Sequence, residues 1–364
     1  MKKILIFASH TGGGHISLAE AIRDQVQNRY EAVIVDPQPR AVNFHYRTVS
    51  RHALWLWEAE FKLTDGTRRA RMAHELSKHT FAISILRAIR RVKPDLIFST
   101  YPFLTSEVMY AMRLFRIRLP FAMLFSDPNG VHRSWLTEKR AQATFAPTQE
   151  TYQQALASGF NPHRTHFTGW PVRGQFYHAV PVPLLHLGLD ENKFTVFLQG
   201  GGDGAARFAR TVEHVLNIEN VQIILAAGTN RKLVDQFKDR DHIHVLPFTS
   251  EIAPFMAAAD VVMGKAGPNM LFESVTLGKP FIATAYIPGQ EQVNLGFIHR
   301  HKLGWIALKD TSQQYIIRLL EADRDLLNNR IQTVDAYRRM NTAATLQIPN
   351  LIDDFLKENE LVGV

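Results

Sequence analysis

Short apolar runs alternate with longer amphipathic stretches along all 364 residues, and this alternation most constrains the fold. The strand-like runs are 3–8, 32–36, 95–99, 121–125, 143–146, 166–169, 194–199, 221–227, 242–246, 260–263, 280–285 and 304–308. The helical stretches between them include 15–29, 71–92, 149–158, 205–216, 268–277 and 312–330. Strand and helix in regular alternation predict parallel sheets with helices on both faces, so the predicted fold class is α/β.

A proline-containing connector at residues 179–193, AVPVPLLHLGLDENK, interrupts this pattern. Proline neither continues a helix nor pairs in a central strand. We therefore predict two Rossmann-like, doubly wound domains at 1–178 and 194–345, joined by a linker at 179–193. A C-terminal helix at 346–364 is expected to pack back on the first domain. Two such domains facing each other form a cleft, and ligands bind at the carboxyl ends of the strands.

The net charge of +8 is unevenly distributed. Residues 1–180 contain 24 lysines and arginines against 13 acidic residues, whereas the remainder contains 18 against 21. Such asymmetry predicts a polyanionic partner for the first half, either an anionic membrane surface or a nucleic acid, and a solvated basic face is the alternative. The chain has no cysteine, which excludes disulfides and thiolate sites and fits a cytoplasmic location.

Two glycine-rich loops each follow a strand and precede a helix. They contain Gly12–Gly14 in the first half and Gly200–Gly202 with Gly204 in the second. Glycine permits positive φ and close approach of a ligand, and the following helix N-terminus favours a phosphate. A dinucleotide-binding fingerprint is the rival interpretation, since Asp36 ends the second strand, but Ser17 stands where its third glycine belongs. Tight turns without a ligand are the structural alternative.

His15 lies directly after the first loop, at the start of a predicted helix. An imidazole with an ordinary pKa near 6.5 is suited to removing a proton from a hydroxyl group. The chain has sixteen histidines, so position rather than residue type marks His15 as the candidate base.

Residues 261–297 contain the densest set of polar side chains near strand ends. A buried strand ends in Lys265, Ala266 and Gly267, and Pro268 begins a helix that contains Glu273. Such a carboxylate can accept hydrogen bonds from two ribose hydroxyls while the helix N-terminus binds a diphosphate. Gln290 and Glu291 follow the next strand. A helix with a solvated glutamate is the alternative.

Residues 44–63 and the basic residues after them form the best candidate membrane surface. Aromatic anchors beside a polybasic patch hold soluble proteins on anionic bilayers. The anchors are Trp55, Trp57 and Phe61, and the nearest cations are Arg68 and Arg69. The tryptophans could instead pack under a loop, and no recognisable nucleic-acid module accompanies the patch, so we expect no nucleic-acid partner.

Three segments go beyond generic features of the fold: TGGGHISLAEAI, KAGPNMLFESVTLGKPFI with YIPGQEQVN, and GWPVRGQF. In these segments the sequence resembles the monogalactosyldiacylglycerol synthases and processive diacylglycerol glucosyltransferases, relatives of the lipid II N-acetylglucosaminyltransferase. The matches occur in order across nearly the whole chain. Ile16, Asn269 and Gly174 depart from the family pattern and leave the sugar and the acceptor open.

The resemblance implies a GT-B fold and inverting transfer from a UDP-sugar, with no cofactor and no obligatory metal. It implies peripheral attachment to the inner face of the cell membrane, with diacylglycerol as acceptor. By position, Glu273 would bind the ribose and the Phe248 region the uracil. The diphosphate would contact Gly201, Gly202 and residues Lys265 to Pro268, and the sugar hydroxyls would contact Gln290 and Glu291. Gly14 would also belong to the UDP-sugar site. His15 or Asp127 would be the base, and His132 and Trp135 belong to the polar segment after a mid-domain strand.

Three alternatives remain open from the sequence. The acceptor could be another lipid-linked or soluble molecule, the chain could be a UDP-sugar 2-epimerase, or it could sense UDP-sugars without catalysis. The sequence also leaves open galactose, glucose or N-acetylglucosamine as the sugar. The two Asp-Arg-Asp segments, 239–241 and 323–325, superficially resemble a metal motif. The first lies in a charged turn and the second in a predicted polar helix, so we expect both to be solvated.

Overall fold

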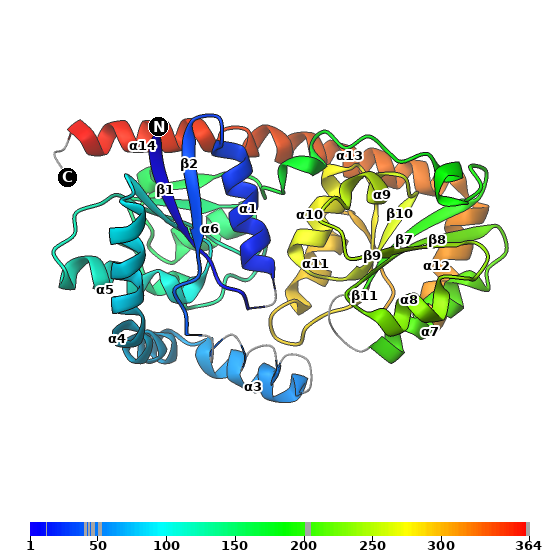
Figure 1. Cartoon of the computed structure of the whole chain (residues 1–364), viewed down its shortest axis with the longest axis horizontal. Helices are drawn as coiled ribbons and strands as arrows, with labels where there is room; N and C mark the ends of the chain where they lie inside the picture. Colours follow the sequence, from blue (N-terminus) through cyan, green and yellow to red (C-terminus); the bar gives the residue numbers. More distant parts are fainter. Residues whose placement is uncertain are drawn as a thin grey trace. The chain divides into compact units, whose positions relative to one another are not determined.

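The computed structural model describes the chain except for residues 12, 40–41, 43, 45–47, 50–52, 201–204 and 362–364, and except for the side chains of residues 54, 205–207 and 359–361. The chain divides into two compact units. The first comprises Met1–Gly174, Pro288–Gln290 and Met340–Val364, and the second comprises Gln175–Ile287 and Glu291–Arg339. Each unit contains one six-stranded sheet enclosed by helices (Figure 1).

The first sheet is entirely parallel and has the order β2-β1-β3-β4-β5-β6. Its strands are β1 (Lys2–Phe7), β2 (Tyr30–Val35), β3 (Leu96–Ser99), β4 (Phe121–Leu124), β5 (Ala143–Ala146) and β6 (Thr165–Phe167). Residues 4–7 of β1 are fully buried, as the continuous apolar run predicts for a strand covered on both faces.

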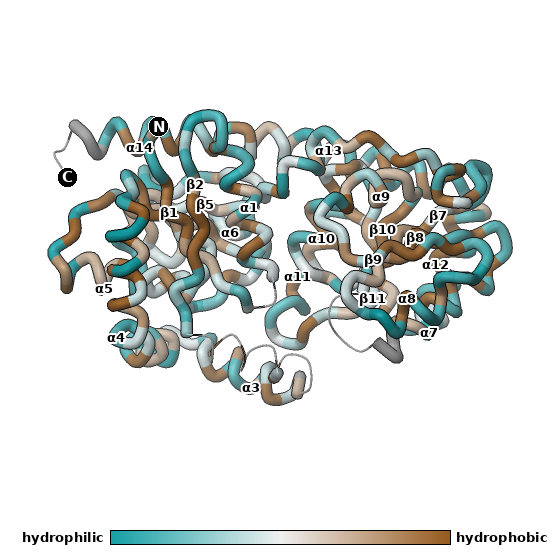
Figure 2. The backbone as a smooth tube through the Cα atoms, in the orientation of Figure 1, coloured by the Kyte–Doolittle hydropathy of each residue, from teal (hydrophilic) through white to brown (hydrophobic). Residues whose placement is uncertain are grey.

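The second sheet is also parallel and has the order β12-β11-β10-β7-β8-β9. Its strands are β7 (Phe194–Gln199), β8 (Val221–Gly228), β9 (Ile243–Pro247), β10 (Val261–Lys265), β11 (Phe281–Ala285) and β12 (Gly304–Ile306). All twelve predicted strands are confirmed, with ends that agree within two residues. Both sheets show strongly hydrophobic strands beneath more polar helices (Figure 2).

Each sheet has a point where the strand order reverses. In the first sheet β1 pairs with β3, and Phe7 lies opposite Ser99. In the second sheet β7 pairs with β10, and Gln199 lies opposite Gly264. The loops that follow these strands diverge to opposite faces, which opens a crevice at the carboxyl ends where ligands bind in doubly wound sheets.

The helices of the first unit are α1 (Gly14–Val26), α3 (Leu54–Thr64), α4 (Thr67–Val92), α5 (Ser106–Leu114), α6 (Gln149–Ala157) and α14 (Ile348–Leu361). The second unit has α7 (Ala205–Leu216), α8 (Arg231–Phe237), α9 (Ala253–Ala257), α10 (Pro268–Thr276), α11 (Gln292–Arg300) and α12 (Asp310–Ala322). Helix α13 (Arg324–Thr345) begins in the second unit and ends in the first. Within the described ranges, no helix is both long and apolar enough to cross a membrane.

The prediction of one helical stretch over 312–330 was wrong, because α12 and α13 are separate helices. Asp323 adopts a non-helical conformation between them, and its carboxylate accepts the backbone N–H of Leu326 at 2.9 Å. An aspartate that caps the following helix in this way competes with continuation of the preceding one.

The GWPVR segment attaches the end of α13 to the first unit. The backbone N–H of Trp170 donates to Asn341 Oδ1 at 2.7 Å, and Asn341 Nδ2 donates to the Trp170 carbonyl at 3.0 Å. Gly169 has φ +66°, and a Cβ there would lie 2.5 Å from the Asn341 carbonyl oxygen. Nearby, α14 packs on α1, and Arg29 pairs with Asp353 at 2.6 Å.

We expect Gly169→Ala to destabilise the first unit by more than about 2 kcal/mol, because the methyl group meets backbone that cannot move locally. Gly159→Ala is the matched control. Gly159 has φ +84° in the same unit, but its nearest contact is the flexible end of Lys139, so only the conformational cost of about 1 kcal/mol applies. Chemical denaturation of both variants measures the difference. If both variants lost the same free energy of unfolding, the close approach of Gly169 to the Asn341 backbone would not contribute to stability.

Candidate functional site

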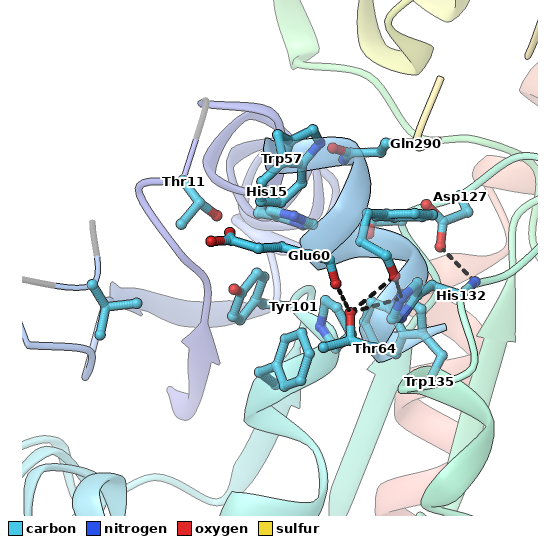
Figure 3. Close-up of a pocket in the computed structure, with 15 residues that line it drawn as sticks. Thr11, His15, Trp57, Glu60, Thr64, Tyr101, Asp127, His132, Trp135 and Gln290 are labelled. Carbon is cyan, nitrogen blue, oxygen red and sulfur yellow. Dashed lines mark hydrogen bonds between the residues drawn. The ribbon is translucent and has the colours of Figure 1, made fainter. Parts of the chain in front are cut away.

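A cavity of about 220 Å³ lies in the first unit, at the carboxyl ends of its strands (Figure 3). Its walls come from the segments that follow β1, β3 and β4, from helices α1 and α3, and from the segment 288–290. The lining residues are Thr11, His15, Val42, Trp57, Glu60, Phe61, Thr64, Tyr101, Pro102, Phe103, Ser126, Asp127, His132, Trp135 and Gln290. Seven of these fifteen residues are apolar or aromatic, and the other eight carry polar or titratable side chains.

His15 lies one residue after the start of α1, beside the strand-order reversal of the first sheet. Gly13, with φ +80°, supplies the left-handed turn before the helix. The His15 Nδ1 lies 2.9 Å from the carbonyl oxygen of Thr100, and the Thr100 hydroxyl donates to the His15 carbonyl at 3.1 Å. Because a carbonyl can only accept, Nδ1 carries the proton and Nε2 keeps its lone pair.

Burial lowers the pKa of His15 to about 4, although the hydrogen bond to Thr100 and the negative Asp36 partly oppose this. The imidazole is therefore neutral at neutral pH. The ring of Tyr101 packs edge-on against it, with 4.7 Å between centroids, and limits its rotation. His15 thus presents a fixed hydrogen-bond acceptor.

Asp127 follows β4 and brings a carboxylate to the same cavity. Burial, and to a smaller extent the nearby Asp65, raise its pKa to about 7, although the backbone N–H of His132 donates to Oδ2 at 3.3 Å and opposes the shift. A carboxyl with this pKa exchanges its proton near neutral pH, the range in which general acid–base catalysis is most effective.

Helix α3 and the segment 131–135 form the aromatic side of the cavity. The rings of Phe61 and His132 lie 4.6 Å apart, and Trp135 is fully buried. The structure divides the proposed membrane and acceptor residues into two groups. Trp57, Phe61, His132 and Trp135 line the cavity, whereas Trp55, Arg68 and Arg69 are exposed.

In the second unit, the residues after β10 form a compact polar cluster. Lys265 forms an ion pair with Glu291, which is 4% exposed, and the other oxygen of Glu291 accepts the backbone N–H of Ile287 at 2.8 Å. Asn294 Nδ2 donates to the Ala266 carbonyl at 2.8 Å and fixes the turn. Gly267 then precedes α10, which begins at Pro268.

The N-terminus of α10 has no side-chain cap. The exposed N–H groups of such a helix end can donate to an anion, as the sequence predicts for a diphosphate. A Cβ at Gly267 would lie 3.4 Å from Glu291 Oε1 and 3.5 Å from Lys265 Nζ, so the cluster and the helix end share one site.

The remaining predicted nucleotide residues are more dispersed. Glu273 is buried in α10, and Phe248 follows β9 with 73% of its surface exposed. Gly14 begins α1 in the first unit. Gly201 and Gly202 lie outside the described residues. Gln290 lines the cavity of the first unit, where its Oε1 is buried and accepts no hydrogen bond from the described residues.

Sequence reasoning missed the residues that orient His15. Thr100 and Tyr101 directly follow β3, the strand that pairs with β1, so the rule that ligands bind at the strand-order reversal points to them. Thr11 and Glu60 also line the cavity without having been predicted. Over the ranges the structure describes, no three histidine, aspartate or glutamate side chains are grouped as a metal site.

Comparison with known sequences identifies both halves of the chain. Residues 15–172 match the monogalactosyldiacylglycerol (MGDG) synthase family, and residues 195–353 match the glycosyltransferase family 28 C-terminal domain. The probable MGDG synthase of Nicotiana tabacum is 27% identical over 83% of this chain, and MGDG synthase 1 of Arabidopsis thaliana is 28% identical over 83%. The matches span 61% and 62% of those two proteins.

Solved structures share the two-domain architecture. MurG of Acinetobacter baumannii superimposes with a TM-score of 0.65 over 97% of this chain and 100% of its own, at 17% identity. The calicheamicin glycosyltransferase CalG4 gives a TM-score of 0.67 over 98% and 99% of the two chains, at 12% identity. These similarities confirm the predicted GT-B fold. The resemblance to the MGDG synthase family that the motifs indicated is confirmed over residues 15–172.

The raised pKa of Asp127 predicts that this carboxylate destabilises the fold. The folded protein binds the proton more tightly than the unfolded chain, so stability falls as the pH rises from about 4 to about 7. We expect Asp127→Asn to be more stable than the parent by about 4 kcal/mol at pH 8 and nearly equally stable at pH 4. Urea denaturation at both pH values measures this.

His15→Gln provides a control of opposite sign. The pKa of His15 is lowered, so the parent protein loses stability as the pH falls from 6.5 towards 4, and glutamine does not titrate. The stability of this variant relative to the parent should therefore rise at low pH. A parallel pH dependence for both variants would contradict the assigned charge states.

Proposed function

We propose that the chain transfers a hexose from a UDP-sugar to diacylglycerol, with inversion, to give a β-glycosyl diacylglycerol. The observation that carries this is the cavity of the first unit. It places two proton-accepting groups, His15 and Asp127, against an aromatic and apolar wall, within a domain whose sequence relatives are MGDG synthases. The hydroxyl of a diacylglycerol needs a proton acceptor, and the apolar chains beside it need an apolar wall.

The reaction assigns different tasks to the two groups. The acceptor hydroxyl attacks the anomeric carbon, the bond from that carbon to the UDP oxygen breaks, and the hydroxyl proton must leave. We assign this proton to Asp127, whose pKa of about 7 matches the working pH. The hydroxyl has only this one proton, so His15 Nε2 can accept a hydrogen bond from it only before the transfer, when that bond aims the attacking oxygen.

The second unit would bind the donor. The uncapped N-terminus of α10 and Lys265 are suited to the diphosphate, whose charge grows as the sugar departs. Gly201, Gly202, Ala266, Gly267 and Pro268 would complete this part, and Gly14 is a separate candidate for contact with the UDP-sugar. We propose Glu273 for the ribose, Phe248 for the uracil, and Gln290 with Glu291 for the sugar. Among proteins of similar fold, HepE of Anabaena has been solved in complex with UDP-glucose.

The exposed face of α3 and α4 would hold the protein on an anionic membrane surface, which we place at the cytoplasmic face. Trp55 is 75% exposed and Leu76 is 78% exposed, and both belong to helices that carry cations. Further exposed apolar residues are Leu63, Met72 and Ile83, and the neighbouring exposed cations include Arg68, Arg69 and Arg71. Each near-surface cation adds roughly 1 kcal/mol of attraction to anionic lipid.

Purified protein with diacylglycerol vesicles and a panel of UDP-sugars tests this function. We expect glycolipid and UDP from one preferred donor, in the presence of EDTA, and faster on anionic than on neutral vesicles. Asp127→Asn should reduce the rate at least about 100-fold, the usual contribution of a general base. The exposed Glu219→Gln serves as control and should leave the rate unchanged.

Each other outcome identifies an alternative. UDP release without glycolipid would indicate a different acceptor. Conversion of the UDP-sugar to an epimer would indicate a 2-epimerase. UDP binding without any turnover would indicate a sensor.

A further inference from the structure

A buried ion pair lies behind the cavity, in a place that the proposed reaction does not use. His74 of α4 and Glu107 of α5 are 4% and 0% exposed, and His74 Nδ1 lies 2.8 Å from Glu107 Oε1. His74 Nε2 lies 3.1 Å from the carbonyl oxygen of Ser134. Both partners of the ring are acceptors, so both ring nitrogens carry protons and the imidazole is positively charged.

The charge state agrees with the surroundings. Burial alone would lower the pKa of His74, but hydrogen bonding and attraction by Glu107 outweigh it, and the pKa is raised. Glu138 adds a smaller attraction of the same sign. Ser77, one turn along α4, also donates to Glu107.

Ser134 connects this pair to the cavity. Its backbone N–H donates to His132 Nδ1 at 3.2 Å, and its hydroxyl lies 2.6 Å from the same nitrogen. His132 Nδ1 is therefore an acceptor, and the ring proton is on Nε2. That nitrogen faces α3, with the Phe61 carbonyl at 3.5 Å and the Thr64 hydroxyl at 3.4 Å.

The chain of contacts ends at Asp127, because the backbone N–H of His132 donates to its carboxylate at 3.3 Å. We propose that His74 and Glu107 are positioning residues, which hold segment 132–134 and through it the carboxylate of Asp127 and the α3 wall. This inference rests on the proposed function, since it concerns the same cavity. It assigns a role to His74 and Glu107, neither of which lines the cavity.

A link that only held α4 and α5 together would not need a buried ion pair such as His74–Glu107. Buried ion pairs contribute little net stability compared with apolar packing. The same two helices also share a second hydrogen bond, between His79 Nδ1 and the Tyr110 hydroxyl at 3.0 Å. That bond is exposed and makes no contact with segment 132–134 among the described residues, so it provides a matched control.

The test compares a double variant, His74→Leu with Glu107→Met, against Tyr110→Phe. Removing both charges avoids an unpaired buried ion and should preserve folding. The His74 donor to the Ser134 carbonyl is lost, and the Thr137 hydroxyl remains a donor to it at 2.8 Å. Hydrogen–deuterium exchange followed by mass spectrometry needs no substrate. We expect faster exchange in residues 131–136 and at the end of α3 in the double variant, and parent-like exchange there in Tyr110→Phe.

The pH dependence of transfer measures the consequence at Asp127. The charged or titratable groups around this carboxyl are His15 from α1, Glu60 from α3, Asp65 directly after α3, and His132. Loss of the His132 N–H should raise the pKa of Asp127 further. A rise of one unit lowers the ionised fraction at pH 7 about fivefold, so the rate of the double variant should fall about fivefold there and recover at higher pH.

Two results would overturn the proposal: exchange in residues 131–136 that matches the parent, or faster exchange with a parent-like pH profile. Tyr110→Phe must keep the parent's pH dependence of transfer. A shift in this variant would show that losing any hydrogen bond between α4 and α5 changes the pH dependence, whichever residues form the bond. If the parent protein transfers no sugar from any donor, the proposed function fails. The exchange comparison still decides in that case whether His74 and Glu107 hold the segment.

Discussion

The hydrogen bond from His15 Nδ1 to the Thr100 carbonyl joins the start of α1, at the end of the loop after β1, to the loop after β3. These loops follow β1 and β3, neighbouring strands whose connections run to opposite faces. The bond fixes the tautomer, so the lone pair of Nε2 is available at any pH above about 4. The proposed chemistry of the cavity depends on this tautomer, because an Nε2 that already carries a proton has no lone pair with which to accept a hydrogen bond from the hydroxyl.

The second unit also has a strand-order reversal in its sheet, but different side chains follow it. Its strand-order reversal lies between β7 and β10, and the residues after β10 form the Lys265–Glu291 cluster beside an uncapped helix end. One sheet thus brings proton acceptors to its reversal point, and the other brings a cation and N–H donors. This difference fits an acceptor hydroxyl in one unit and a diphosphate in the other.

The sequence predicted most of the fold because burial on both faces makes each strand a recognisable apolar run. It also placed His15 and Lys265 to Pro268 at helix starts, since glycine and proline mark those turns. It missed the break at Asp323, where a local side-chain cap overrides a continuous helical pattern. It could not separate Trp55 from Trp57, whose positions two apart on α3 point in different directions.

Long-range partners were beyond the reach of sequence reasoning. His74 and Glu107 are 33 residues apart, and His15 and Thr100 are 85 apart. Neither pair has a spacing or composition that marks it, because contact arises only when α4, α5 and the strand-end loops pack together. A single sequence records the residue types but not these pairings.

Nitrogen-15 NMR of histidine-labelled protein tests the central claim most directly, with the His15→Gln spectrum used to assign the His15 resonances. The account predicts a protonated Nδ1 and an unprotonated Nε2 for His15 at pH 6, with protonation of Nε2 only as the pH approaches 4. A doubly protonated ring at pH 6, or a proton on Nε2 in place of Nδ1, would contradict it.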